Sequence, residues 1–476
     1  MNRLDFGDSA FAVLTASPAA PAAAPAAGAS NSHGLLLSEL IGALSHALDL
    51  TEGQPKGHCV RCCWIGMHIA RELGLSAREQ WELYYTLLLK DLGCSSNAAR
   101  ICELYVTDDL TFKRDFKRVG DGTPQVLAFV LRHTGLGAGM AKRLGAVLNI
   151  VRNGPQIAHE LIATRCQRGA DIARQLRFPE AVSQGIHALD EHWNGQGKPD
   201  ALAGAAIPLY ARIALLAQVV DVFRTADGPH AALAEAQARS GSWFDPALVD
   251  ALERAGQRPG FWGQLDAPTL DRELLALEPG HFRVDLDDDY LDDIAAAFGQ
   301  VVDAKSPYTS GHSERVGHYA DQIARRLGVP AARRRWLKRA ALLHDVGKLG
   351  VSNAVLDKPG KLDEAEWEAV RRHARYTQEI LGRIDAFAEL AQVAAAHHER
   401  LDGNGYPNRI AGDAISLETR IITTADIFDA ISAQRPYRDA VPLAETLAIM
   451  AETVGTALDP LCFEALRGVV EEEMGK

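Results

Sequence analysis

The sequence contains no apolar run that approaches the roughly 20 residues a membrane-spanning helix requires. Its first residues, MNRLDFGDSA, have neither a basic start nor a leucine-rich core, so we expect no secretory signal peptide. Only seven residues are cysteines, and no second cysteine pair has the spacing of a zinc ribbon, which suits a reducing compartment. We therefore expect a cytoplasmic protein with no membrane segment.

An excess of positive charge is also missing, because the formal net charge is −12 at pH 7. This balance argues against binding to a nucleic-acid polymer or to an anionic membrane surface. The hydrophobic content of 47% and the charged content of 24% are those of an ordinary soluble protein. A chain of 476 residues is too long for one ordinary core, so two or three domains are expected.

Strand-like alternation of apolar and polar residues is scarce along the chain. From Leu35 onward, apolar residues such as Leu36, Leu40 and Leu44 recur at steps of three and four, which predicts helices. Before this point, residues 16–30 are dominated by alanine and proline, which predicts a disordered tail. The expected fold is all-α.

Two clusters of histidine and carboxylate residues are present in the C-terminal half, HDVGK at 344–348 and HHERLDGNGYP at 397–407. Imidazole and carboxylate groups are the ligands that iron, manganese and zinc accept. Lys348 follows the His-Asp pair by about one turn and is placed to contact a phosphate bound at the metal. Arg435 and Arg438 supply two further anion-binding groups. The combination predicts a metal-dependent phosphohydrolase.

These clusters belong to an ordered series of motifs that resembles the HD-GYP family of cyclic-di-GMP phosphodiesterases. The series reads GHSERV at 311–316, HD at 344–345, KPG at 358–360, His373, HHERLDGNGYP at 397–407, ADIFD at 425–429, RPYR at 435–438 and DP at 459–460. A lone His-Asp pair arises often by chance, whereas this many landmarks in one order do not. The resemblance implies a cytoplasmic enzyme that hydrolyses cyclic di-GMP to pGpG or onward to GMP.

The resemblance also implies a dinuclear transition-metal centre, with iron or manganese favoured. One metal ion would take His312, His344, Asp345 and Asp426, and the second would share Asp345 and add His373, His397 and His398. Metal binding would lower the pKa of a water molecule enough for nucleophilic attack on phosphorus. Asp345 and Lys348 would be the catalytic residues, and Lys348 would share the negative charge that develops.

Substrate contacts follow from the same resemblance. They are expected from Lys348, Gly405, Tyr406, Pro407, Arg435 and Arg438. The Tyr406 ring would offer an apolar face to a guanine at the pocket mouth. At Tyr308 the chain has a phenol where some family members place a glutamate for a third metal, which favours two metal ions.

Two alternatives stay open at this point. One is an HD phosphohydrolase that acts on another cyclic dinucleotide or on a linear product. The other is a nucleotide-responsive scaffold that binds a partner and turns over little substrate.

An internal repeat links the two halves of the chain. A shift of 254 residues places His58 on His312, IARELG at 69–74 on IARRLG at 323–328, and LLKDLG at 88–93 on LLHDVG at 342–347. A shift of 208 residues places GQGKP at 195–199 on GNGYP at 403–407. Constant offsets across several anchors predict two HD-type helical domains in tandem.

The first copy has lost most of the expected metal ligands. Beyond the kept His58 and Asp91, the two registers replace His344 by Lys90, His373 by Arg165, His397 and His398 by Leu189 and Asp190, Asp426 by Gln218, and Lys348 by Cys94. Lysine and arginine cannot ligate a metal as histidine does. We expect a degenerate scaffold that serves in sensing, in forming a homodimer, or in binding other signalling proteins.

Two further expectations concern the cysteines of this copy and the domain boundaries. Cys59, Cys62 and Cys63 could form a zinc or redox motif, although thiols buried on a helix are the simpler interpretation. The expected domains are a tail at 1–34, the degenerate HD-like domain at 35–260, a linker at 261–288 and the catalytic HD-GYP domain at 289–476.

Overall fold

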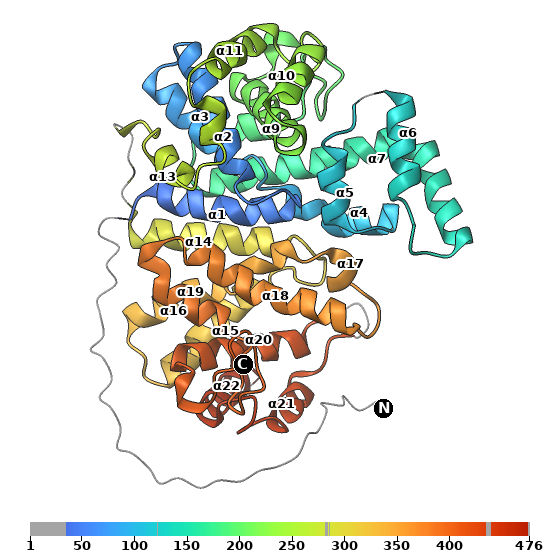
Figure 1. Ribbon diagram of the computed structural model, residues 1–476. Coiled ribbons are helices and arrows are strands. Elements are labelled where there is room, and N and C mark those ends of the chain that lie inside the picture. The colour runs from blue at the N-terminus through green and yellow to red at the C-terminus, as the bar shows by residue number, and fades with distance from the viewer. Residues whose placement is uncertain (1–34, 121, 281–283, 285, 435–438, 475–476) are drawn as a thin grey trace. The chain divides into compact units, whose positions relative to one another are not determined.

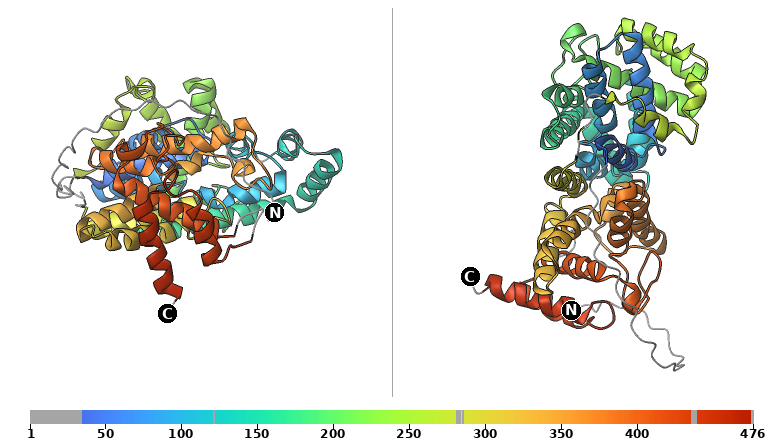
Figure 2. Two further views of the ribbon diagram at one scale, coloured as in Figure 1. Left: turned by 90° about the horizontal axis from the view of Figure 1, so that it is seen from below. Right: turned by 90° about the vertical axis from the view of Figure 1, so that its left-hand side faces the viewer.

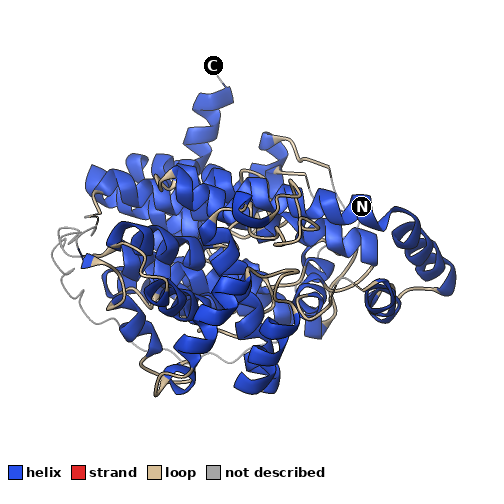
Figure 3. Ribbon diagram, turned by 90° about the horizontal axis from the view of Figure 1, so that it is seen from above, coloured by secondary structure: helices blue, strands red, loops and turns tan. Residues whose placement is uncertain are grey.

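The computed structural model describes residues 35–120, 122–280, 284, 286–434 and 439–474. Helices make up the regular structure of these residues, with isolated β-bridges such as Ser240–Phe244 and Val454–Leu458 beside them (Figures 1 and 3). The predicted all-α fold is therefore confirmed. None of the helices in the described part of the chain is both long enough and apolar enough to cross a membrane.

The elements follow one another in this order: α1 (Leu37–Thr51), α2 (His58–Glu72), α3 (Ala77–Leu89), η1 (Cys94–Asn97), α4 (Ala98–Tyr105), α5 (Asp109–Phe116), α6 (Thr123–His133), α7 (Met140–Gln175), α8 (Glu180–His187), η2 (Gly204–Ala206), α9 (Leu209–Asp227), α10 (Pro229–Ala238), α11 (Pro246–Gly256), α12 (Phe261–Gln264), α13 (Leu270–Leu275), α14 (Asp288–Asp303), α15 (His312–Arg326), α16 (Ala331–Leu343), η4 (Val346–Gly350), α17 (Asn353–Leu356), α18 (Glu364–Leu381), η5 (Asp385–Phe387), α19 (Ala388–Ala395), η6 (Gly412–Ala414), α20 (Leu417–Ser432), α21 (Leu443–Ala451) and α22 (Pro460–Met474).

Local signals start several of these helices. At α18, the Asp363 carboxylate accepts from the Glu366 backbone N–H at 2.9 Å, and Glu366 accepts from the Asp363 N–H at 2.7 Å. This reciprocal capping box satisfies two backbone donors that a helix start leaves unpaired. At α20, the Ser416 hydroxyl caps the N–H of Thr419 at 3.2 Å. These capping residues fix where α18 and α20 begin, and both helices carry candidate metal ligands.

The predicted tandem repeat is confirmed element by element. In the first register α2 and α3 correspond to α15 and α16, and in the second α8 and α9 correspond to α19 and α20. The two groups of helices are distinguishable in Figure 2 by their blue-to-green and yellow-to-red colours. Gly93 and Gly347 are also equivalent, because a Cβ at either would overlap the carbonyl oxygen of Arg165 or of His373, respectively. Each glycine therefore allows the equivalent helix of its own copy, α7 or α18, to approach closely.

The register changes from 254 to 208 between these groups, so the first copy carries a 46-residue insertion. The insertion covers α5, α6 and the first half of α7, whereas α4 precedes it and corresponds to α17 in the first register. Together with α4, its buried side chains form a separate small core that includes Ile101, Phe112, Phe129 and Ile150. Most of the other buried apolar residues of both copies belong to one continuous core.

A buried carboxylate joins the two copies. Asp109, at the start of α5, accepts from the Asn353 backbone N–H at 2.8 Å and from the Ser352 hydroxyl at 3.1 Å, and lies 3.5 Å from the Lys305 ammonium. All three partners belong to the second copy. The range expected to be a linker contains α12 and α13, which pack on the first copy and in which Phe261 is buried. The domain boundaries stay predictions.

Candidate metal centre

Five segments deliver the seven predicted metal ligands to one place. His312 is the first residue of α15, and His344 and Asp345 directly follow the end of α16. His373 lies inside α18 and Asp426 inside α20. His397 and His398 follow α19, in the turn beyond its last residue. The site is therefore built from helix ends and from two helix interiors, a common arrangement for metal sites in helical proteins.

Asp345 stands between two groups of histidines. Its Oδ2 is 3.4 Å from His312 Nε2 and 3.2 Å from His344 Nε2. Its Oδ1 is 3.5 Å from His373 Nε2 and 3.6 Å from His397 Nε2. One carboxylate thus presents one oxygen to each group, which is the geometry of a residue that bridges two metal ions.

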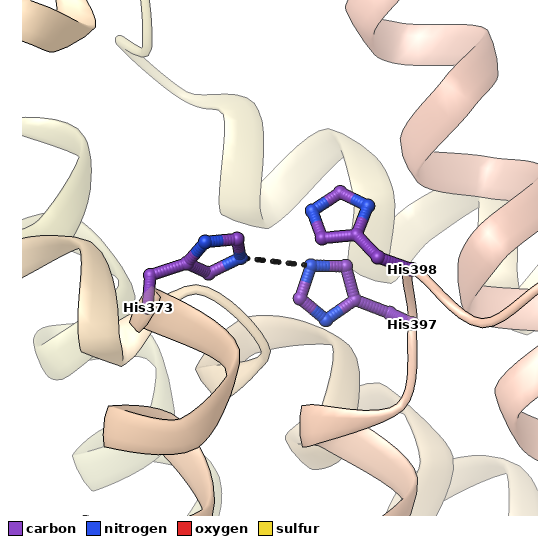
Figure 4. Close-up of side chains that lie close together, drawn as sticks. All are labelled: His373, His397 and His398. Atoms are coloured by element: carbon purple, nitrogen blue, oxygen red, sulfur yellow. Dashed lines mark hydrogen bonds between the residues drawn. The ribbon is translucent and has the colours of Figure 1, made fainter. Parts of the chain in front are cut away.

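Each group is completed by one more residue. Asp426 Oδ1 lies 3.3 Å from His312 Nε2, on the side of the first group. The second group joins His373, His397 and His398, whose candidate ligand atoms lie within 4.8 Å of one another. In Figure 4 these three imidazoles turn toward one another, and His373 Nε2 is 3.4 Å from His397 Nε2.

In four of the histidines, the Nδ1 atom makes a hydrogen bond on the side of the ring that faces away from the centre. Three of them donate to the backbone carbonyl three residues earlier, at 2.6 Å for His344, 2.5 Å for His373 and 2.6 Å for His397. His312 Nδ1 instead contacts Asp429 Oδ2 at 2.7 Å. These bonds fix each ring so that Nε2 faces the centre, as the outer partners of metal-binding histidines do.

The buried polar atoms at the centre indicate that a cation belongs there. His312 Nε2, His344 Nε2 and Asp345 Oδ1 are buried and have no hydrogen-bond partner. Leaving such groups unpaired costs free energy, so native proteins pair them or give them a metal. Nitrogen and carboxylate donors in this number suit a transition metal, and the residues present therefore fit one.

The protonation states of His373, His398 and Asp345 agree with this donor chemistry. Burial lowers the pKa of His373 to about 4 and that of His398 to about 3, which leaves both rings neutral at pH 7. Burial alone would raise the pKa of Asp345, but His344 and Lys348 hold it well below its usual value. Neutral imidazole and ionised carboxylate are the forms that bind a metal. At His312, burial is outweighed by the carboxylates of Asp345, Asp426 and Asp429, which raise the pKa of the ring, so that a bound metal would replace a proton there.

Lys348 and the loop at 403–407 border the centre. The Lys348 ammonium contacts Asp345 Oδ2, and about a fifth of its side chain is exposed, so it lies between the buried donors and solvent. Tyr406 lies over His398, with ring centroids 4.7 Å apart. A Cβ at Gly405 would come within 2.5 Å of the Arg400 backbone nitrogen, so the loop closes this tightly only with glycine there.

Some predicted substrate contacts cannot be placed. Arg435 and Arg438 lie outside the described residues. Pro407 follows Tyr406 in the loop, where the Tyr406 N–H donates to the His398 carbonyl at 3.2 Å. Tyr308, where a third-metal ligand would stand, is half-buried, and its N–H donates to the Ser306 hydroxyl at 3.2 Å.

Three supporting residues were not assigned from the sequence. The sequence left Asp429 as either a partner of a ligand or a surface acid, and the structure buries it against His312 and Arg315. The Thr377 hydroxyl donates to the His344 carbonyl at 3.0 Å, and the Thr423 hydroxyl donates to the His397 carbonyl at 2.7 Å. For both threonines the only available signal was a polar residue on an otherwise buried helix face.

The corresponding place in the first copy holds side-chain cations. The Lys90 ammonium contacts Asp91, and Lys117, from the end of α5, lies 2.7 Å from Glu52 and 3.8 Å from Asp91. The Arg165 guanidinium contacts Asp190. Three side-chain cations thus balance three carboxylates, and these cations would repel any added divalent metal ions. This arrangement agrees with the predicted loss of the metal site.

The first copy keeps one ion-pair arrangement of the second, around Asp221. His58 Nδ1 is 2.7 Å from Asp221, which also accepts from Arg61 at 2.7 Å, just as His312 and Arg315 share Asp429. Cys59, Cys62 and Cys63 are fully buried on α2 and form no disulfide. Burial raises the pKa of the Cys59 and Cys63 thiols well above the usual value, which opposes thiolate chemistry.

Comparison with known proteins agrees with the fold and the centre. A family model described as HD domain matches residues 135–248 and 297–461. The chain belongs to the HD-domain family, and within it to the HD-GYP-type phosphodiesterases, with a degenerate first copy. HD-domain phosphohydrolases depend on a divalent metal, which the donor set described above would hold.

Two relatives match both copies, and a third matches a shorter part of the chain. The chain is 59% identical over 431 residues to 3'3'-cGAMP-specific phosphodiesterase 3 of Vibrio cholerae, which covers 90% of this chain and 94% of that protein. A crystal structure of the cyclic GMP-AMP-specific phosphodiesterase V-cGAP3 from the same species shares 53% identity and a TM-score of 0.64, and the match covers 92% of this chain and 98% of that chain. The cyclic di-GMP phosphodiesterase response regulator RpfG of Xanthomonas campestris is 42% identical over 160 residues, which is 33% of this chain and 42% of that protein.

Proposed function

We propose that this protein is a phosphodiesterase of a 3',3'-linked cyclic dinucleotide, with 3'3'-cGAMP as the preferred substrate. The structural observation that carries the proposal is the pair of donor groups that share Asp345, because two adjacent metal sites suit the in-line cleavage of a phosphodiester. The choice of substrate is supported by the relatives that match both copies and that are named for cGAMP.

Cyclic di-GMP is the second candidate, and it is the substrate that the motifs alone suggested. Relatives named for it match over a shorter part of the chain. The two substrates differ only in one purine, so the discrimination must come from contacts with that base. Tyr406 can stack on either purine, because every base presents a flat apolar face.

The proposed metal ligands are His312, His344, Asp345, His373, His397, His398 and Asp426. We propose iron or manganese, since both accept a mixed set of imidazole and carboxylate donors. A bound metal pair would lower the pKa of water and polarise the phosphate oxygens. Asp345 would hold the two metal positions at a fixed separation, because one of its oxygens faces each group of histidines.

Lys348 is proposed to bind the scissile phosphate. Its ammonium borders the donors and is partly exposed, so a phosphate oxygen can replace part of its contact with Asp345. A positive charge held in place before the reaction stabilises the charge that grows in the transition state. Gly405 and Tyr406 close the same side of the site and would limit the access of water to it.

Initial rates with the purified full-length protein test the proposal. Supplied with manganese or iron, it should hydrolyse 3'3'-cGAMP with a kcat/KM at least about tenfold above that for cyclic di-GMP. Asp345→Asn should reduce turnover by a factor of about 10³ or more, because the shared ligand is lost.

Asp91→Asn is the matched control in the first copy and should leave turnover within about twofold, provided circular dichroism shows a folded protein. A preference for cyclic di-GMP would reverse the proposed specificity. Failure to hydrolyse either substrate with either metal would favour the scaffold alternative.

A further inference from the structure

Exposed apolar side chains gather on the insertion of the first copy. Nine of the twelve large hydrophobic side chains that are exposed in the described residues lie between residues 116 and 151. They are Phe116, Val126, Leu127, Leu131, Leu136, Met140, Leu144, Leu148 and Val151. Soluble monomers seldom expose an apolar patch larger than a few hundred Å², so this concentration points to a partner.

Four of these residues form a stripe along the first half of α7. Met140, Leu144, Leu148 and Val151 are exposed by 88%, 70%, 65% and 57%, respectively. Steps of four, four and three residues place them on one face of the helix. This stretch of helix belongs to the insertion, and in Figure 1 it projects together with α6 away from the other helices of the first copy.

A second face of the same helix is already covered by other parts of the protein. Ile150 and Ile157 are buried in the small core of the insertion, against Phe129 and Val130 of α6. The stretch is therefore apolar on two faces and has a partner on only one. A helix that is apolar on two faces is stable in water when both are covered.

The stripe residues themselves are uncharged and few cations flank them, which favours a protein partner over a membrane surface. Lys142 lies on the far side of the helix, whereas Arg152, one turn after Leu148, borders the stripe. Arg143 is turned toward α6, where it donates to the Leu131 carbonyl at 3.0 Å. An anionic membrane is bound through clusters of cations beside an apolar face, whereas an apolar seam at this spacing with one bordering cation is typical of helix–helix packing.

We propose that the stripe is the dimer interface of this protein and that its occupant is the same stripe of a second copy. Two α7 segments can pack antiparallel about a twofold axis, because a stripe from 140 to 151 is then complementary to itself, with Leu144 of one copy beside Leu148 of the other. Together with α6 the two insertions form a four-helix bundle. Nine partly exposed side chains per copy supply an apolar area on the order of the 800 Å² per partner that stable interfaces bury.

Sedimentation velocity of the full-length protein tests this interface. At about 50 µM the parent should sediment with twice the chain mass of 51.4 kDa. Leu144→Glu combined with Leu148→Glu should return the single-chain mass and raise the dissociation constant by roughly 100-fold or more, since two central apolar contacts are lost. Both side chains are mostly exposed in the single chain, so circular dichroism and the thermal midpoint should stay unchanged.

Leu461→Glu is the matched control, because Leu461 on α22 is 68% exposed but lies outside the insertion. It should leave the dimer intact. In a second test, Leu144→Cys with Leu148→Cys should give a disulfide-linked dimer on mild oxidation, and Leu461→Cys should not.

Three results would overturn the inference. They are a parent that sediments as a single chain at about 50 µM, a dimer that survives both glutamate substitutions, and a single chain that floats with phosphatidylserine vesicles. The last would assign the stripe to an anionic membrane instead.

Discussion

Asp345 differs from the other six candidate ligands because each of its oxygens faces a different group of histidines. Oδ2 lies beside His312 and His344, and Oδ1 lies beside His373 and His397. The identity of these residues could be predicted from motifs in the sequence. Which ring nitrogen faces the centre could not, because the outer hydrogen bonds decide it, and these come from backbone carbonyls and from Asp429.

Asp429 should tune the affinity for metal. Asp429→Asn removes the negative charge behind His312, and we expect a 10- to 100-fold weaker affinity, as for other outer-partner substitutions. Competition with a chelator measures this. Asp221→Asn is the control, since Asp221 makes the same contacts with His58 and Arg61 in the first copy, for which we propose no metal site. An equal loss of affinity in both variants would show a general effect on folding.

Lys348 should act on the chemical step. Lys348→Ala should lower kcat by about 10²-fold, because the charge that develops on phosphate loses its nearest ammonium, while metal content stays near that of the parent. Lys338→Ala removes an exposed lysine of α16 and should change neither quantity. Joint loss of metal and activity in Lys348→Ala would instead make Lys348 a structural residue.

At the scale of elements, α5 is the helix that sequence comparison could not interpret. It belongs to the insertion and has no counterpart in the second copy, so neither register aligns Lys117 with anything. Yet its first residue, Asp109, binds the second copy, and Lys117 at its end contacts Glu52 at the place in the first copy that corresponds to the candidate metal centre. The apolar stripe on α7 was equally hidden, because periodicity shows an apolar face without showing whether anything covers it.

Lys117 should set the acid sensitivity of the first copy. Burial would raise the pKa of Glu52, but Lys117 and other cations lower it to about 2 from an ordinary value of 4.5. Because the folded-state pKa is depressed, this stabilisation is present above pH 4.5 and is lost as the pH falls toward 2. Lys117→Met should lower the free energy of unfolding by about 3 kcal/mol at pH 7, since two buried carboxylates lose a partner.

Urea unfolding at a series of pH values measures this effect. The difference between the parent and Lys117→Met should shrink as the pH falls from 4.5 toward 2. Arg114→Met removes an exposed cation of the same helix and should change the stability by less than about 0.5 kcal/mol. A difference that stays constant down to the lowest pH would show that Lys117 does not stabilise the protein through its ion pair with Glu52.

At the scale of the whole molecule, two copies of one fold hold their central carboxylates in different ways. The second leaves buried donors without protein partners, whereas the first supplies its own cations. The purified protein should therefore contain about two transition-metal ions per chain, as measured by elemental analysis. Asp426→Ala should lower this number, and Gln218→Ala, at the equivalent place in the first copy, should not. Metal loss from Gln218→Ala would contradict the assignment of all metal to the second copy.

The lysine and arginine side chains that fill the first copy cannot be exchanged, diluted or withheld as a dissolved ion can. Under the proposed assignment, starvation for the metal would remove ions from the second copy alone, while the first would keep its structure and its apolar stripe. Starved cells would then hold an inactive enzyme that is still folded. Returning metal would restore turnover without new protein synthesis, so the enzyme's response to metal supply would be set by ion binding alone.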